Sequence, residues 1–108
     1  MSNENIIGQA MTMKDMVTSQ PGSVVSRTLI DKKIGTITLF AFAEGQGLSE
    51  HTAPFDAFVQ VLEGTGKINI NGEDHQVEAG QMIIMPANVP HSLRAEVPFK
   101  MLLVMIRA

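Results

Sequence analysis

The fold expected of this chain rests on the stretch Gly80-Gln81-Met82-Ile83-Ile84-Met85-Pro86-Ala87-Asn88-Val89-Pro90-His91. The short apolar run Met82–Met85, which follows a glycine turn, is typical of a buried strand. Pro86 and Pro90 then bracket a loop, because proline lacks the N–H group that a central strand needs. The stretch therefore predicts a strand, a fixed loop and a histidine held at its end.

A second segment has a similar outline nearer the start of the chain. It begins at Gly45, reaches His51 after a five-residue spacer and closes at Gly64. The two segments together predict two strand-and-loop units, each of which presents one histidine.

The chain between and around these segments has the pattern of an all-β domain. Short β-branched runs alternate with turn signals from Ser23 onward, and Asn71-Gly72 is the strongest hairpin signal. The expected strands are Ser23–Ile30, Ile34–Phe42, Phe58–Leu62, Lys67–Ile70, Asp74–Val77, Met82–Met85, His91–Ala95 and Phe99–Ile106. About eight or nine strands at this spacing predict a sandwich or barrel over residues 23–108.

Two features point to packing outside the barrel. The predicted strand Ile34–Phe42 has apolar residues on both faces, which is typical of a strand covered on both sides. Residues 1–22 do not alternate; Met11–Val17 predicts one or two helical turns before Pro21-Gly22. We expect residues 1–22 to form an N-terminal arm that packs on the barrel or on a second subunit.

Composition excludes several classes of function. The net charge is −3 without a run of like charges, which argues against nucleic acid and anionic membranes as partners. The absence of cysteine excludes disulfides and a thiol nucleophile. No apolar run approaches the roughly 20 residues of a membrane-spanning helix, and the first residues lack the pattern of a signal peptide. The expected location is the cytoplasm.

The first segment resembles the first of two motifs of the cupin family, whose members are double-stranded β-helix (jelly-roll) barrels. That motif runs glycine, five residues, His-x-His, three or four residues, glutamate, six residues, glycine. Gly45, His51 and Gly64 fit it, whereas Ala53 and Ala57 stand at the second histidine and the glutamate.

The second segment resembles the second motif of the family, glycine, five residues, Pro-x-Gly, two residues, histidine, three residues, asparagine. Gly80, Pro86 and His91 fit this motif, Asn88 replaces its inner glycine and Ala95 its asparagine. Asparagine tolerates positive φ better than most residues, so Asn88 can keep the turn.

The resemblance implies a metal site with an incomplete ligand set. Cupins that bind a divalent ion (Zn, Fe, Mn or Ni) use the histidines and the glutamate of these motifs, and here only His51 and His91 remain. Two imidazoles do not reach the ligand sets of non-haem iron or of catalytic zinc.

Other residues near the motif are alternative third ligands. Asp56 and Gln60 flank the Ala57 position, and Glu50 precedes the first motif histidine. If residue 57 points into the barrel, strand alternation turns residues 56 and 60 outward. A β-bulge after Pro54 would instead bring Asp56 inward.

The leading functional hypothesis is a barrel that binds a small molecule. Ala53 and Ala57 are expected to leave a roomy, uncharged cavity, and each neutral imidazole offers one donor and one acceptor. The expected pocket residues are His51, His91, Phe40, Phe42, Met85 and Met105.

Three alternatives stay open. His51 and His91 could serve as general acid and base in an isomerase-like enzyme, or bind metal with water or Asp56 in a dioxygenase-like one. The chain could also be a regulatory module without chemistry, since cupins commonly pair through their sheets, and a homodimer is expected in any case. The third histidine, His75, is expected to be a solvated turn residue.

Overall fold

The computed structural model describes residues 6–108, and strands make up most of their regular structure. A short 3-10 turn, η2 (Met13–Asp15), precedes the strands. The strands are β1 (Val24–Lys32), β2 (Gly35–Phe42), β3 (Gly47–His51), β4 (Phe55–Glu63), β5 (Thr65–Ile70), β6 (Glu73–Glu78), β7 (Met82–Met85), β8 (His91–Arg94) and β9 (Phe99–Arg107). Residues 1–5 of the predicted arm lie outside the described part of the chain.

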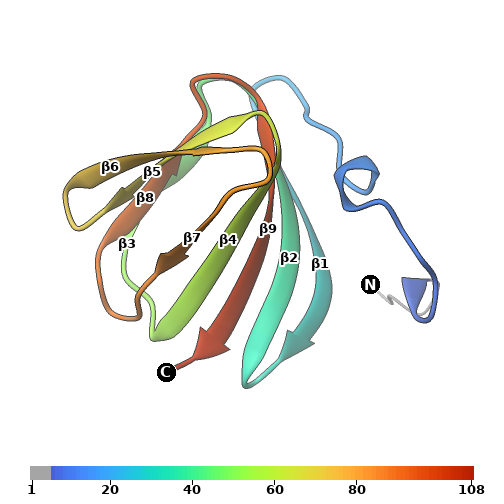
Figure 1. Ribbon diagram of the computed structural model, residues 1–108, viewed down its shortest axis with the longest axis horizontal. Coiled ribbons are helices and arrows are strands. Elements are labelled where there is room, and N and C mark those ends of the chain that lie inside the picture. Colours follow the sequence, from blue (N-terminus) through green and yellow to red (C-terminus); the bar gives the residue numbers. More distant parts are fainter. Residues whose placement is uncertain (1–5) are drawn as a thin grey trace.

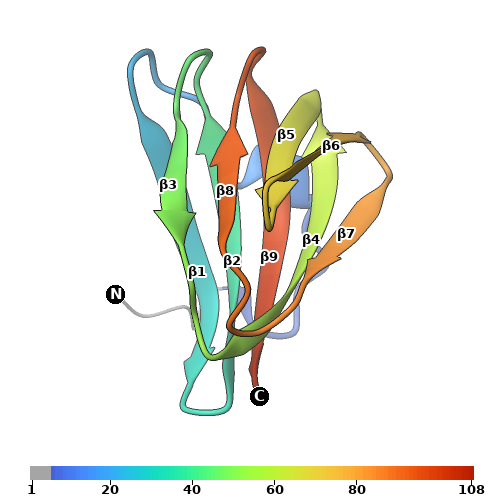
Figure 2. The same cartoon turned by 90° about the vertical axis from the view of Figure 1, so that its left-hand side faces the viewer.

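The strands form two antiparallel sheets that face each other (Figure 1). The five-stranded sheet has the order β1-β2-β9-β4-β7, and the four-stranded sheet has the order β3-β8-β5-β6. Figure 2 shows the four-stranded sheet in front of the other. The prediction of an all-β jelly-roll barrel is confirmed.

Two strand assignments from the sequence were wrong. The sequence predicts no strand between Phe42 and Phe58, but residues Gly47–His51 form β3. This strand lies at the edge of its sheet and is mostly exposed, so it carries polar residues and shows no apolar alternation. Strand β4 likewise begins at Phe55 instead of Phe58.

The core lies between the two sheets. Phe42 and Phe99 are fully buried and stack with ring centroids 4.6 Å apart. Gly66 makes this stack fit, because a Cβ atom at that position would lie 2.8 Å from the Phe99 ring. Aromatic packing therefore fills the end of the barrel where β9 begins.

The arm packs on the outer face of the five-stranded sheet (Figure 1). Val17 is buried there against Leu39 and Ala41 of β2. The Nζ atom of Lys100 donates a hydrogen bond to the Lys14 carbonyl at 2.6 Å. Strand β2 is thus covered on both faces, as its sequence predicts.

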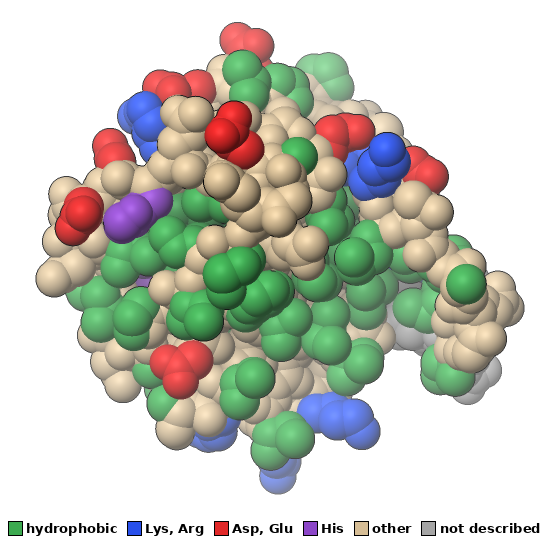
Figure 3. Space-filling model, in the orientation of Figure 1, with side chains coloured by type: hydrophobic (Ala, Val, Ile, Leu, Met, Phe, Trp, Pro, Cys, Tyr) green, Lys and Arg blue, Asp and Glu red, His purple; other side chains and the backbone are tan. Residues whose placement is uncertain are grey.

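Part of that outer face is apolar and is not covered by residues 6–108. A row of apolar residues, here called the outer ladder, crosses all five strands through cross-strand pairs; its members are Ile30, Ile37, Val104, Phe58 and Ile84. The side chains of Ile30 and Ile84, at the two ends, are 45% and 54% exposed. Figure 3 shows hydrophobic side chains gathered over the strands of this sheet, with most charged ones towards the rim.

Candidate functional site

Strands β3 and β8 pair antiparallel and place His51 directly opposite His91. The Nε2 atoms of the two imidazoles are 3.2 Å apart. Their rings meet edge to face, with centroids 4.4 Å apart and an interplanar angle of 69°. The two motif histidines therefore converge as the sequence predicts.

A β-bulge turns His51 towards this pair. Leu48 lies opposite Leu93 and His51 opposite His91, so β3 has one more residue than β8 between the two rungs. Strict alternation from Leu48 would have pointed Glu50 inward and His51 outward. The Ser49 carbonyl within the bulge accepts a hydrogen bond from His51 Nδ1 at 2.7 Å.

His91 is held by the loop that joins β7 to β8. Asn88 has φ of 63°, which confirms that asparagine keeps the turn of the second motif. The Asn88 N–H donates to the Ala53 carbonyl at 2.8 Å, and the Ala87 N–H donates to Asp56 Oδ1 at 2.9 Å. Figure 2 shows the β3–β4 and β7–β8 connections side by side at this end of the barrel.

The two imidazoles differ in exposure but share one protonation pattern. His51 is exposed, whereas His91 is only 5% exposed. His91 Nδ1 lies 3.0 Å from the Val89 carbonyl, and a carbonyl can only accept, so both Nδ1 atoms carry protons. Burial lowers the pKa of His91, a hydrogen bond to Val89 opposes that shift, and the charge of His51 adds to it. In the neutral pair, two Nε2 lone pairs therefore face each other.

An apolar cavity adjoins this pair. It is lined by Leu48, His51, Ala53, Phe55, Ala57, Met85, His91, Leu93, Met101, Leu103 and Met105. Of the predicted walls, Met85 and Met105 lie here. Phe40 and Phe42 do not, because Phe42 belongs to the stack at the other end of the barrel and Phe40 lies 5.7 Å from Phe42. The inward alternation of β4 and β9 could have predicted Phe55, Met101 and Leu103.

The cavity is much smaller than the two alanines suggest. Its volume is about 40 Å³, compared with the roughly 300–1,000 Å³ of pockets that enclose a drug-sized ligand. Long side chains from β4, β7 and β9, among them Phe55, Met85 and Met105, project into the space beside Ala57. Only a few heavy atoms fit inside this form of the barrel.

The donors of the cavity do not suit a hard divalent ion. Within residues 6–108 no three His, Cys, Asp or Glu side chains come together as a metal site. Asp56 is exposed and accepts the Ala87 N–H, so the bulge that would have turned it inward is absent. Glu50 is exposed and lines a hollow on the outside of the four-stranded sheet. His75 lies in β6 and is half-buried, so its assignment to a turn was wrong.

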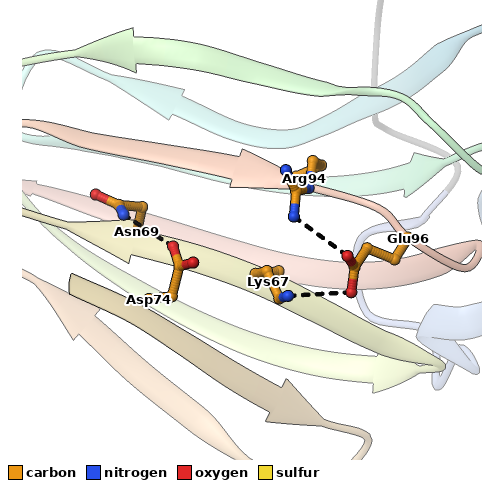
Figure 4. Close-up of polar contacts among 5 residues, drawn as sticks. All are labelled: Lys67, Asn69, Asp74, Arg94 and Glu96. Atoms are coloured by element: carbon orange, nitrogen blue, oxygen red, sulfur yellow. Dashed lines mark hydrogen bonds and ion pairs between the residues drawn. The ribbon is translucent and has the colours of Figure 1, made fainter. Parts of the chain in front are cut away.

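That outer hollow, of about 470 Å³, is polar, and its cations are already paired. Lys67 and Arg94 contact Glu96 at 3.1 and 3.2 Å, and Asn69 donates to Asp74 at 2.8 Å (Figure 4). A hydrogen bond from Lys67 and its charge lower the pKa of Glu96, with a smaller effect from Arg94. Among the described residues, the hollow therefore offers no unpaired cation to a ligand.

Comparisons with known proteins agree on one family. A family model described as "Cupin domain" matches residues 38–106. A conserved protein of unknown function from Streptococcus pyogenes is 36% identical, with a TM-score of 0.90 over 94% of this chain and 89% of that one. A cupin 2 conserved barrel domain protein from Leptotrichia buccalis is 38% identical, with a TM-score of 0.88 over 90% of this chain and 47% of that one.

A more distant structure supports the fold alone. A predicted oxalate decarboxylase from Thermotoga maritima is 21% identical, with a TM-score of 0.74 over 81% of this chain and 83% of that one. No curated protein matches the chain. Across residues 6–108, no helix is long and apolar enough to cross a membrane.

Proposed function

Because this chain belongs to the cupin family, we propose that it binds a small polar molecule at the mouth of its barrel, with His51 and His91 as the two polar anchors. The observation that carries this proposal is the convergence of the two Nε2 atoms, 3.2 Å apart, on the edge of an apolar cavity. His51 is exposed, so a ligand can reach the pair from solvent.

The protonation pattern defines the ligand class. Both Nδ1 atoms are committed to backbone carbonyls, so the neutral pair offers acceptors only. The anchoring group of the ligand is therefore a hydrogen-bond donor, such as a hydroxyl or an ammonium group. A cavity of about 40 Å³ admits that group and a few atoms beyond it, and the rest of the ligand stays at the mouth.

A thermal-shift screen tests this proposal. Polyols, amines and aromatic alcohols form the donor set, and carboxylates without a donor group form the comparison set. A ligand at 100 times its Kd stabilises the fold by about 2.7 kcal/mol, which is several degrees in Tm for a domain of this size. Donor ligands should raise Tm in the wild type and in a His75→Ala control, but not in His51→Ala or His91→Ala. If no donor ligand raises Tm, or if the shift survives His91→Ala, the proposal fails.

A metal centre is the second candidate, and the spacing of the imidazoles favours it. Two nitrogens bound to one ion at about 2.1 Å would lie about 3.0 Å apart in an octahedral site and about 3.4 Å apart in a tetrahedral one, and the observed 3.2 Å falls between these values. Hydrogen bonds from Nδ1 to Ser49 and Val89 are also the usual support for imidazole ligands. Elemental analysis tests this candidate, first on protein purified without added metal and then on protein incubated with metal ions. Protein that stays metal-free in both cases would contradict it.

We further propose that the chain forms a homodimer through the outer ladder. No ladder residue is charged, and its two ends are exposed. Exposed apolar patches of this kind mark interaction surfaces. The ladder crosses all five strands with Val104 in the middle, so a twofold axis there would pack the row against itself.

A further inference from the structure

The methionines of the cavity carry chemistry that a hydrogen-bonded ligand leaves unused. Ala57, at the position of the family glutamate, pairs across strands with Met85 of β7 and with Met105 of β9. All three residues line the same cavity as the two imidazoles. Two thioethers therefore flank the position from which the carboxylate is missing.

We propose that this cavity binds monovalent copper through Nε2 of His51 and His91 and the thioether sulfurs of Met85 and Met105. The inference rests on the proposed role of the histidine pair as electron-pair donors, and it identifies Cu(I) as the acceptor of those electron pairs. Thioether and imidazole ligands suit Cu(I), whereas carboxylate, carbonyl and water ligands suit hard divalent ions. Two imidazoles and two thioethers therefore suit a soft ion such as Cu(I) better than a hard divalent ion.

The charge of the cavity supports a monovalent ion. No carboxylate of residues 6–108 lines it, and every proposed ligand is neutral. The cost of burying an ion rises with the square of its charge, and proteins offset that cost with paired charges. Met85 and His91 are 2% and 5% exposed, so on its inner side a divalent ion would lack both water and a counter-charge.

Strand register and exposure distinguish Met85 and Met105 from the other methionines. Met101 also lines the cavity, but it pairs with Val61, farther along β4 towards the stacked phenylalanines. Met82 lies on β7 with Met85, but it is 46% exposed. Methionine has three rotatable bonds, so the sulfurs of Met85 and Met105 can adjust to an ion placed between the imidazoles.

The test is an anaerobic Cu(I) titration against the chromophoric chelator bicinchoninate, using the full chain. We expect one Cu(I) per chain, and copper K-edge X-ray absorption should show sulfur as well as nitrogen in the coordination shell. Met85→Leu and Met105→Leu conserve volume. Each should weaken Cu(I) binding by more than the roughly 10- to 100-fold that loss of an outer hydrogen-bond partner costs. The matched control Met82→Leu, on the same strand, should leave Cu(I) affinity unchanged.

The outcomes separate this inference from the proposed function. If Cu(I) does not bind while donor ligands still shift Tm through His51 and His91, only the copper inference is overturned. Copper binding that survives both Met85→Leu and Met105→Leu, or that is lost in Met82→Leu, also overturns it. If neither copper nor any donor ligand depends on the two histidines, both proposals fail. Circular dichroism of each leucine variant shows that it is folded.

Discussion

The two sheets of the barrel supply different chemistry to the space between them. The four-stranded sheet provides both imidazoles, His51 from β3 and His91 from β8. The five-stranded sheet provides Ala57 and the two flanking thioethers, Met85 and Met105. Nitrogen donors therefore come from one sheet and sulfur donors from the other. Changes on the first sheet should decide whether a ligand is held, and changes on the second should decide which ligand is preferred.

The outer faces of the sheets differ as well. The four-stranded sheet carries charged side chains on its outer face, such as those of the Lys67–Glu96 pair (Figure 4). The five-stranded sheet packs the arm on part of its outer face, and residues 6–108 leave the two ends of the outer ladder exposed. The outer face of the four-stranded sheet is therefore typical of a surface in contact with water, whereas that of the five-stranded sheet is typical of a protein interface.

The largest expected effect comes from a charge in the outer ladder. Phe58→Glu would bury an unpaired carboxylate in the proposed dimer, at a cost of about 3 kcal/mol or more, which is over roughly 100-fold in the dissociation constant. Light scattering after size exclusion should show a dimer for the wild type and a monomer for the variant. Gln76→Glu, an exposed site on β6 of the other sheet, is the matched control and should stay dimeric. A wild-type monomer at micromolar concentration would contradict the interface.

A carboxylate between the thioethers should change the preferred ion. Ala57→Glu completes a set of two imidazoles and one carboxylate, the number of ligands typical of catalytic zinc. Zinc affinity should rise about 100-fold, or about 2.7 kcal/mol, while Cu(I) affinity falls. Competition titrations of both ions on wild type and variant measure the exchange. Equal changes for the two ions would show that the residue at position 57 does not set selectivity.

The loop between β7 and β8 links the five-stranded sheet, which provides the thioethers, to the four-stranded sheet, which provides the imidazoles. Asn88 has φ of 63° there, and a β-branched side chain in that conformation costs roughly 1–2 kcal/mol. Asn88→Val should lower the free energy of unfolding by that amount in urea and loosen His91. Asn88→Gly, which tolerates positive φ, should stay within a few tenths of the wild type. Equal stability of the valine variant would show that the turn does not constrain His91.

The sequence predicted what depends on local rules. The hairpin at Asn71-Gly72, the positive φ of Asn88 and the convergence of the two motif histidines all follow from turn chemistry or from the motif spacing. The sequence did not predict β3, because an exposed edge strand needs no alternation of apolar and polar residues. The bulge that turns His51 inward has no sequence signal either.

The sequence also did not predict the small volume of the cavity. It depends on how side chains from β4, β7 and β9 fill the space beside Ala57, and these strands are distant in sequence. The placement of Met85 and Met105 on either side of Ala57 likewise needs the sheet register, which no single strand contains.

The smallest expected effect is on the outer face of the four-stranded sheet. The hydrogen bond and charge of Lys67 hold the pKa of Glu96 below its ordinary value of 4.5. A carboxyl with a lowered folded pKa stabilises the fold above its unfolded pKa, and that contribution is lost as the pH falls through the folded value. Glu96→Gln should therefore lower Tm slightly at neutral pH, and the difference should vanish well below pH 4.5. Glu78→Gln, also exposed, is the control.

Because salt at 1 M reduces the screening length to about 3 Å, it should abolish the Glu96 effect and leave dimerisation through the apolar ladder intact. A dimer that dissociates in salt would show that the two exteriors do not differ in the way proposed.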